Sequence, residues 1–486
     1  MNKFTNNVKS FLTFGAMAII AAAMCINPAK AAPVDSSVAK KVASNFYNYE
    51  LAGRNADSET PHLAWVGTDE QKSGIVCFYV FNFDNGFVIV SAEDKVSPIL
   101  AFSQEAPFDV HNCPVNMRLF LRDYVQAISQ ISNVNAYTSK IQDWNEQLVP
   151  AVSIQVSDNM DPLIQTKWDQ GKYYNNCCPL DSNGPNGHAY TGCIATVMGQ
   201  LIRYWEYPTS GFGSHSYMAN NSEDGHGDYG MLSVNFAEAH YHYDLMPATL
   251  SYSSTDEEVD AVATLLFHCG VSVDMRYGSS GSGAATLDVP NAMQQYFGYP
   301  ECHYEYRNDY SDSLWAEMVK AELDAGRPLY YNGHIDTNGG GHAFICDAYR
   351  FNDYFHFNWG WSGNGNGYFR LSNLHVGQTP LNTNQGAIFG LHAPNVNVES
   401  LDTPENILCY PNPTTGNVNF SIADLSASPN VEVRVYDVYG KQVLATSPCS
   451  NSGTVSLEEF PSGVYLLRFY TDGKMISNQK IVKTGR

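Results

Sequence analysis

The chain has 486 residues, of which 44% are hydrophobic and 13% aromatic. This composition excludes global disorder, and at roughly 100–200 residues per domain the length corresponds to two to four domains. The net charge is −22: residues 1–31 contribute +3 and residues 406–486 contribute +1, so the stretch between them carries −26. So acidic a surface repels phosphate backbones and argues against a nucleic-acid partner.

Residues 1–31 are typical of a secretory signal peptide. Lys3 and Lys9 precede an apolar run from Phe11 to Ile26, and Ala29-Lys30-Ala31 is a small-x-small cleavage site. We therefore expect cleavage after Ala31 and export. No other stretch approaches the roughly 20 apolar residues of a membrane span, so we expect no span in the exported protein.

Residues 32–154 predict an α+β unit. The apolar runs 75–83 and 87–90 flank Asp84-Asn85-Gly86, which is a strong hairpin signal. Residues 115–131 then show helical periodicity. This unit contains no group of residues that resembles a catalytic site.

Residues 155–395 predict a second α+β unit, in which helices come before strands rather than alternating with them. Thr255 and Glu258 form a capping box, and Gly326 suits the position after a helix. The expected helices are 192–207, one beginning after Thr255, and 314–325; the expected strands are 328–332, 342–349 and 354–359.

The C-terminal part is expected to be all-β. Residues 396–405 are polar and are interpreted as a linker. Residues 406–486 contain short strand patterns at 431–438, 464–470 and 475–483, separated by glycine turns, which predicts a small β-sandwich.

Ten of the 11 cysteines remain once the signal peptide is removed. Ten cysteines permit five disulfides in an oxidising compartment, but a chain of this size folds without them and the spacings form no framework. No CxxC pair supports a zinc site. Cys409 and Cys449, the two cysteines of residues 406–486, remain a candidate pair.

Cys193 is the first candidate for chemistry. It follows Gly192 and begins an amphipathic helix, and a helix N-terminus stabilises negative charge and lowers the pKa of a thiol. The alternative is an ordinary buried cysteine.

A cysteine nucleophile needs a base, and His342 is the candidate among 14 histidines because it follows a glycine run, Gly339 to Gly341. Asn358, sixteen residues later, is a candidate to orient the imidazole, and Trp359 is a candidate to shield that contact. Gln170 lies 23 residues before Cys193 and would supply an amide donor to an oxyanion, together with the Cys193 N–H.

Other chemistries have weaker support. His240, His242 and Asp244 are a possible metal group, although aromatic surface residues explain the pattern equally well. No GxSxG, HExxH or P-loop motif occurs, and no cofactor is expected.

Several long motifs resemble the streptopain family of papain-like cysteine peptidases: TKWDQGKYYNNCCP, TGCIATVMGQLIRYWEYP, GGHAFICDAY and FHFNWGWSGNGNGYF. The resemblance covers residues 32–395 and implies a papain-like fold with Cys193 as nucleophile, His342 as acid and base, and Gln170 at the oxyanion position. It makes residues 32–154 an inhibitory propeptide removed near residues 147–158. Ser282 and Gly341 fall near the family's substrate-contact positions, and which of Asn358 and Trp359 supports His342 stays open.

Residues 406–486 resemble the C-terminal sorting domain of type IX secretion substrates in Bacteroidetes, on YPNPTTG from Tyr410, VYDVYGK from Val435 and the Ser462-Gly463-Val464-Tyr465 segment. This resemblance implies export through the type IX machinery, removal of the tail, and release or surface attachment.

Together these patterns predict a secreted or surface-bound cysteine endopeptidase made as a zymogen, without a cofactor. Its expected partners are protein or peptide substrates, its own propeptide and the type IX machinery. Two alternatives use the same scaffold. A transamidase would use the same Cys-His pair, and a non-catalytic adhesin would have little reason to keep Cys193, His342 and Gln170 together.

Overall fold

The computed structural model describes residues 33–51, 59–72, 74–132, 140–148, 159–220, 227–300, 302–334, 341–351, 353–371, 375–376, 379–380, 385–394, 407–422, 431–437, 442–449, 452–471 and 474–484. The expected signal peptide, the expected linker and most of the expected cleavage region 147–158 lie outside these residues.

The N-terminal unit, residues 33–148, is an antiparallel sheet with helices on both faces. Its elements are α1 Ser36–Asn45, β1 His62–Asp69, β2 Ile75–Phe83, β3 Gly86–Ser91, β4 Ile99–Ser103, α2 Val115–Ser132 and α3 Ile141–Leu148. Residues alternate along β2 and β3, so that one set packs on α2 and the other on α1. The predicted hairpin and the predicted helix over residues 115–131 are confirmed.

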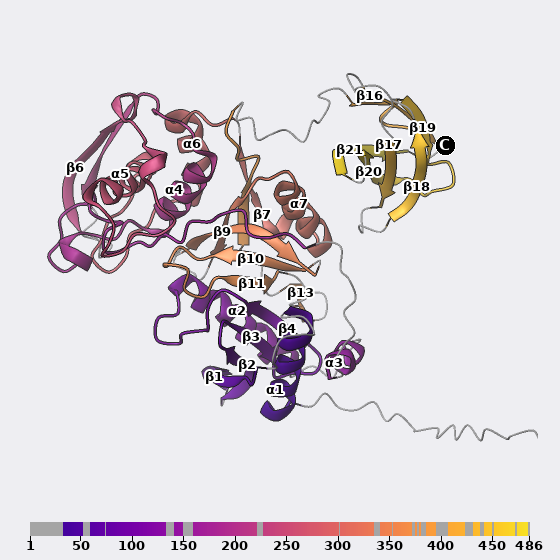
Figure 1. Cartoon of the computed structure of the whole chain (residues 1–486), viewed down its shortest axis with the longest axis horizontal. Coiled ribbons are helices and arrows are strands. Elements are labelled where there is room, and N and C mark those ends of the chain that lie inside the picture. The colour runs from indigo at the N-terminus through magenta and orange to yellow at the C-terminus, as the bar shows by residue number, and fades with distance from the viewer. Residues whose placement is uncertain are drawn as a thin grey trace, which may run out of the picture.

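The central unit, residues 159–394, begins with a helical half (magenta in Figure 1). It contains α4 Cys193–Trp205, the hairpin β5 Ser214–Asn220 and β6 Asp228–Asn235, α5 Asp256–Ser272 and α6 Val289–Phe297. Met198 and Leu201 of α4 share a core with Leu266 of α5. The predicted capping box is present, because Thr255 Oγ1 accepts from the Glu258 N–H and Glu258 accepts from the Thr255 N–H.

The second half of this unit is a sheet with α7 Asp312–Asp324 against it. Its strands are β7 His303–Tyr306, β8 Leu329–His334, β9 Gly341–Arg350, β10 Tyr354–Asn358, β11 Gly367–Arg370 and β14 Gln385–Phe389, with a short pair β12 His375–Val376 and β13 Thr379–Pro380 apart from it. The expected helices and strands are present, but the predicted order of helices first and strands later is interrupted by the hairpin of β5 and β6 before α5 and by β7 before α7.

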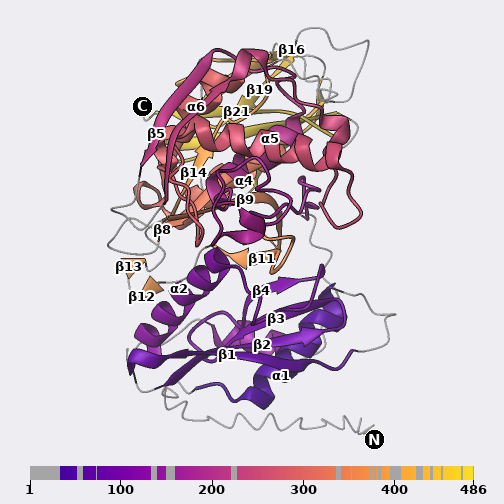
Figure 2. The same ribbon diagram turned by 90° about the vertical axis from the view of Figure 1, so that its left-hand side faces the viewer.

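A single sheet of ten strands joins the two units, in the order β1-β2-β3-β4-β11-β10-β9-β8-β14-β7. The junction is the antiparallel pairing of β4 with β11, where Ala101 lies opposite Phe369 and Phe102 opposite Tyr368. Figure 2 shows the N-terminal unit below the central unit, with β4 next to β11. No pattern in the sequence indicates this junction, because its paired residues are more than 260 positions apart.

The C-terminal unit, residues 407–484, is a β-sandwich as expected. One sheet is β15 Ile407–Tyr410, β16 Asn417–Ile422 and β19 Ser452–Ser456; the other is β18 Gln442–Cys449, β17 Val431–Tyr436, β20 Gly463–Thr471 and β21 Lys474–Lys483. Phe420 of the first sheet and Phe469 of the second meet in a shared core. The candidate pairing of Cys409 with Cys449 is wrong, since Cys409 is a free thiol. Within the described part of the chain, no helix combines the length and apolarity of a membrane span.

Candidate active site

Cys193 is the first residue of α4. The residue before it, Gly192, has a backbone conformation that favours glycine. Gly192 has φ of 87°, in the left-handed region, and a Cβ built on it would lie 2.9 Å from both Met275 Sδ and the Ser282 carbonyl oxygen. The buried face of α4 anchors the helix in the core, so the position of Cys193 is fixed from both sides.

The thiol of Cys193 contacts the start of β9. Its Sγ accepts a hydrogen bond from the Ala343 N–H at 3.5 Å, and Ala343 directly follows His342. Burial raises the pKa of Cys193, although backbone N–H groups of Ala343 and Ile194 act in the opposite direction. The expectation of a lowered thiol pKa is therefore wrong in this state, because desolvation outweighs the helix terminus.

His342 is partly exposed, and burial lowers the pKa of its imidazole. No hydrogen bond joins its ring to another of the described residues. Cys193 and His342 are thus close in the fold through Ala343, and the two pKa shifts favour the neutral thiol and the neutral imidazole.

Gln170 is buried between the segment that leads into Cys193 and the turn that follows β10. Its carbonyl accepts from the N–H and the hydroxyl of Thr191, at 3.0 and 3.2 Å. Its Nε2 donates to the Gly360 carbonyl at 3.4 Å, which is a long and weak contact. The amide is therefore placed near Cys193 with donor capacity left for a ligand.

Asn358 makes its hydrogen bonds away from His342. Its Nδ2 donates to the Thr166 carbonyl at 2.7 Å and to Gln200 Oε1 at 3.3 Å, and its Oδ1 accepts from the Gly360 N–H at 3.1 Å. These bonds connect β10 to α4 and shape the turn beside Gln170.

Trp359 is fully buried, and its Nε1 donates to the Gly365 carbonyl at 3.0 Å. Its ring packs on Phe344 of β9, with centroids 4.6 Å apart, and on Phe120 of α2. Neither Asn358 nor Trp359 has a hydrogen bond to His342, so support of the imidazole by either stays a prediction.

Asn116, on α2 of the N-terminal unit, is a residue of this site that the sequence did not predict. Its Nδ2 donates to the Trp359 carbonyl at 2.7 Å and to the Ala343 carbonyl at 3.3 Å, and its side chain is buried. The signal in the sequence is slight: a polar residue on the apolar face of a predicted helix.

Ser282 and Gly341 border the same region. The Ser282 hydroxyl donates to the Tyr190 carbonyl at 2.6 Å and accepts from the Gly278 N–H at 3.0 Å, which fixes the loop against Gly192. Gly341 begins β9 opposite His334. Gly339 and Gly340 lie outside the described residues.

The structure offers no support for a metal at the His240 group. His240 Nδ1 is hydrogen-bonded to Ser210 Oγ at 2.9 Å, and in the part of the chain that the structure describes no three His, Cys, Asp or Glu side chains form a metal-binding group. The nine cysteines whose side chains the structure describes are all free, including Cys193.

Comparison with protein families assigns all three units. Residues 31–128 match the family described as Spi protease inhibitor, residues 168–369 match the Peptidase C10 family, and residues 408–484 match the secretion system C-terminal sorting domain.

Individual relatives agree. The chain is 28% identical over 432 residues to the thiol protease/hemagglutinin PrtT of Porphyromonas gingivalis, covering 86% of this chain and 48% of that protein, so it spans about half of that relative. It is 29% identical to streptopain of Streptococcus pyogenes, covering 64% of this chain and 77% of that protein. The structure resembles a fragment of Prevotella intermedia prointerpain A, with a TM-score of 0.55, 27% identity, and coverage of 68% of this chain and 99% of that one.

Proposed function

Because the chain belongs to the peptidase C10 family and is a cysteine protease made as a proenzyme, we propose that Cys193 is its nucleophile and His342 its general acid and base. The observation that carries this assignment is the hydrogen bond between Cys193 Sγ and the residue after His342. It brings together two candidates that lie 149 residues apart in the sequence.

The reaction proceeds through an acyl-enzyme. The thiol proton passes from Cys193 to His342, and the thiolate attacks the scissile carbonyl. The oxyanion accepts hydrogen bonds from Gln170 Nε2 and the Cys193 N–H. His342 returns the proton to the leaving amine and then takes one from water, which hydrolyses the thioester. The substrates are proteins or peptides, cut internally.

The N-terminal unit acts as the intramolecular inhibitor. Asn116 bridges the carbonyls of Ala343 and Trp359, which flank the site on β9 and after β10. The propeptide thereby holds β9 in the position in which the Ala343 N–H donates a hydrogen bond to the Cys193 thiol. Loss of this contact frees the thiol and admits water, which lowers the desolvation that now raises the thiol pKa.

Proteolytic processing is proposed to divide the chain into four parts. We assign residues 1–31 to a signal peptide, 32–154 to the propeptide, 155–395 to the peptidase domain and 406–486 to the sorting tail, with maturation cleavage within residues 147–158. The match to a sorting domain indicates secretion or display at the cell surface. Deletion of residues 406–486 is expected to retain the protein inside the cell envelope, and normal levels in the medium or on the surface would contradict this assignment.

Refolded zymogen incubated with and without a thiol-directed inhibitor tests the catalytic assignment. We expect self-cleavage near residues 147–158 and activity on casein only in the uninhibited sample. Product masses that gain one water identify hydrolysis, whereas transfer to an added amine gives a different mass. Cleavage that continues after complete alkylation of Cys193 would remove this cysteine from the mechanism.

A further inference from the structure

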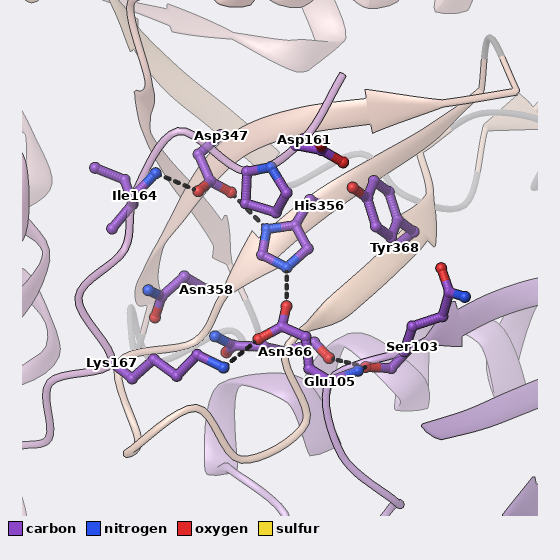
Figure 3. Close-up of polar contacts among 12 residues, drawn as sticks. Ser103, Glu105, Asp161, Ile164, Lys167, Asp347, His356, Asn358, Asn366 and Tyr368 are labelled. Carbon is purple, nitrogen blue, oxygen red and sulfur yellow. Dashed lines mark hydrogen bonds and ion pairs between the residues drawn. The ribbon is translucent and has the colours of Figure 1, made fainter. Parts of the chain in front are cut away.

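Beyond the junction of β4 and β11, the propeptide turns so that one carboxylate enters the peptidase domain (Figure 3). The Ser103 hydroxyl donates to the Asn366 carbonyl at 2.6 Å and accepts from the Glu105 N–H at 3.1 Å. Between them, the Gln104 side chain accepts from Arg350 at 2.7 Å. This turn fixes the direction of the Glu105 side chain.

Glu105 meets His356, a buried histidine that the mechanism does not use. His356 Nε2 lies 2.6 Å from Glu105 Oε1, and its Nδ1 lies 2.5 Å from Asp347 Oδ1. The side chains of His356 and Asp347 are 3% and 0% exposed. Only an imidazolium donates from both ring nitrogens, so two carboxylates facing the two nitrogens favour the charged form of His356.

Lys167 completes the cluster, with its Nζ 2.6 Å from Glu105 Oε2. Figure 3 shows the Glu105 carboxylate between Lys167 and His356, which come from the segment before α4 and from β10. Two positive and two negative groups balance here, and one of the negative groups comes from the propeptide. Without Glu105, the buried His356 and the partly exposed Lys167 of the peptidase domain share a single negative partner, Asp347.

The pKa directions agree with this arrangement. Burial alone would lower the pKa of His356, but Asp347 and Glu105 outweigh it and raise that pKa to about 9. Burial alone would raise the pKa of Glu105, but His356 and Lys167 outweigh it and lower that pKa to about 2. Each group is therefore charged at neutral pH.

We propose that His356 and Lys167, with Asp347 behind them, form a carboxylate-binding site of the peptidase domain whose ligand in the zymogen is Glu105 of the propeptide. This carboxylate site rests on the proposed role of the propeptide as inhibitor. It recognises an acidic side chain that follows a strand added to β11, and is vacated when the propeptide leaves.

The carboxylate site is also connected to the catalytic residues through the chain. Asp347 Oδ2 accepts from the Ile164 N–H at 2.9 Å, which holds the segment that continues through Lys167 to Gln170. His356 is two residues before Asn358 on β10. The Ile164–Asp347 and His356–Asp347 contacts have both partners in the peptidase domain, so removal of the propeptide takes no partner from either.

The test uses the full-length zymogen with Glu105→Gln, which keeps the shape and removes the charge. The rate at which iodoacetamide alkylates Cys193, followed by peptide mass mapping, reports how often the propeptide opens without requiring self-cleavage. We expect at least a tenfold faster rate, the scale for truncating one partner of a buried charge pair. The control is Glu70→Gln, because Glu70 is exposed and has no partner among the described residues.

Lys167→Gln gives a second route if Glu105→Gln folds poorly. The two substitutions remove the same contact, so we expect the double variant to open less than the product of the two single effects. An unchanged alkylation rate in both single variants, or fully multiplicative effects, would overturn the proposal. Mature enzyme from the Glu105→Gln zymogen is chemically the wild-type enzyme and must have the same kcat/KM. If wild-type zymogen gives no active protease, the proposed function fails, while the alkylation comparison still decides the carboxylate site.

Discussion

The propeptide contacts the peptidase domain at two places that differ in charge. At the catalytic site, α2 presents the neutral amide of Asn116 to the carbonyls of Ala343 and Trp359. At the carboxylate site, the turn after β4 presents the charged Glu105 to His356 and Lys167. The first contact lies beside the reacting groups, whereas the second lies outside them.

The two contacts therefore have different roles: the Asn116 contact blocks the catalytic site, and the Glu105 contact holds the propeptide on the peptidase domain. The neutral Asn116 amide holds the Ala343 and Trp359 carbonyls without adding a charge that would have to be moved during activation. A charged contact is stronger in a buried place, but breaking it leaves a costly unpaired group, so it suits a position away from the chemistry. The following substitutions distinguish the two contacts.

The largest effect is expected for Cys193→Ala, which removes the chemistry and leaves both propeptide contacts intact. We expect activity on casein to fall by roughly 10⁴-fold or more, the scale for loss of a catalytic nucleophile. The zymogen should accumulate uncut, with an unchanged thermal unfolding midpoint. Cys409→Ala in the tail is the matched control. Normal self-processing of the purified Cys193→Ala protein would contradict the assignment.

The sequence predicts those parts of the molecule whose cause is local. The hairpin at Asp84 and the helix of Cys193 follow from patterns within about 20 residues, and each is present. Cys193, Gly192 and Gln170 are also recognisable because their motifs are contiguous. The direction of the Cys193 pKa shift was not predictable, because it depends on burial under a strand 150 residues away.

The propeptide contacts have no local cause. His356 is one of 14 histidines and lacks a motif, and its partner Glu105 is 251 residues away. In the sequence, Asn116 is only a polar residue on the apolar face of an amphipathic helix. Its role is visible only when the helix is seen packed against β9. Asn358 lies at the end of β10, and its hydrogen bonds go to Thr166, Gln200 and Gly360. The spacing of two residues in the sequence can indicate that they lie close together in the fold, but it does not show which way each side chain points.

Gln170→Ala separates catalysis from propeptide binding. We expect kcat to fall by roughly 10²–10³-fold, the scale for loss of one oxyanion donor. Alkylation of Cys193 in the zymogen should stay at the wild-type rate, because the hydrogen bond of the Gln170 side chain goes to the Gly360 carbonyl of the peptidase domain and not to the propeptide. Gln165→Ala, at an exposed position five residues earlier, is the control. An unchanged kcat would remove Gln170 from the mechanism.

Asn116→Ala opens the blocking contact and leaves the carboxylate site intact. The hydrogen bonds lost to the Ala343 and Trp359 carbonyls are neutral and buried, so we expect Cys193 alkylation in the zymogen to rise about tenfold. The increase should be nearly independent of salt, since no charge is involved. Gln126→Ala, at an exposed position of the same helix, is the control. Equal rates for Asn116→Ala and Gln126→Ala would mean that Asn116 does not block the site.

The smallest expected effect is that of pH on the carboxylate site, and its direction follows from the groups that face His356. Asp347 on β9 and Glu105 of the propeptide hold the imidazolium, and Lys167 faces Glu105. The Tyr368 ring lies 5.1 Å from the imidazole, and burial raises its phenol pKa, so it stays neutral. The stabilisation from His356 is therefore complete below about pH 6.5 and is lost as pH rises through about 9.

Glu105 responds at low pH, because its pKa is lowered to about 2. The stabilisation that its carboxylate gives to the closed zymogen is lost only as the pH falls toward that value. We therefore expect a shift from pH 7 to pH 5 to leave the propeptide closed and a shift to pH 10 to loosen it by a few-fold. The measurement is the ratio of the Cys193 alkylation rates of Glu105→Gln and wild-type zymogen at each pH. Because both proteins share the same thiol, its titration cancels in this ratio. The ratio should fall toward one between pH 7 and pH 10, and a ratio that instead collapses at pH 5 would show that an acidic group other than Glu105 controls opening.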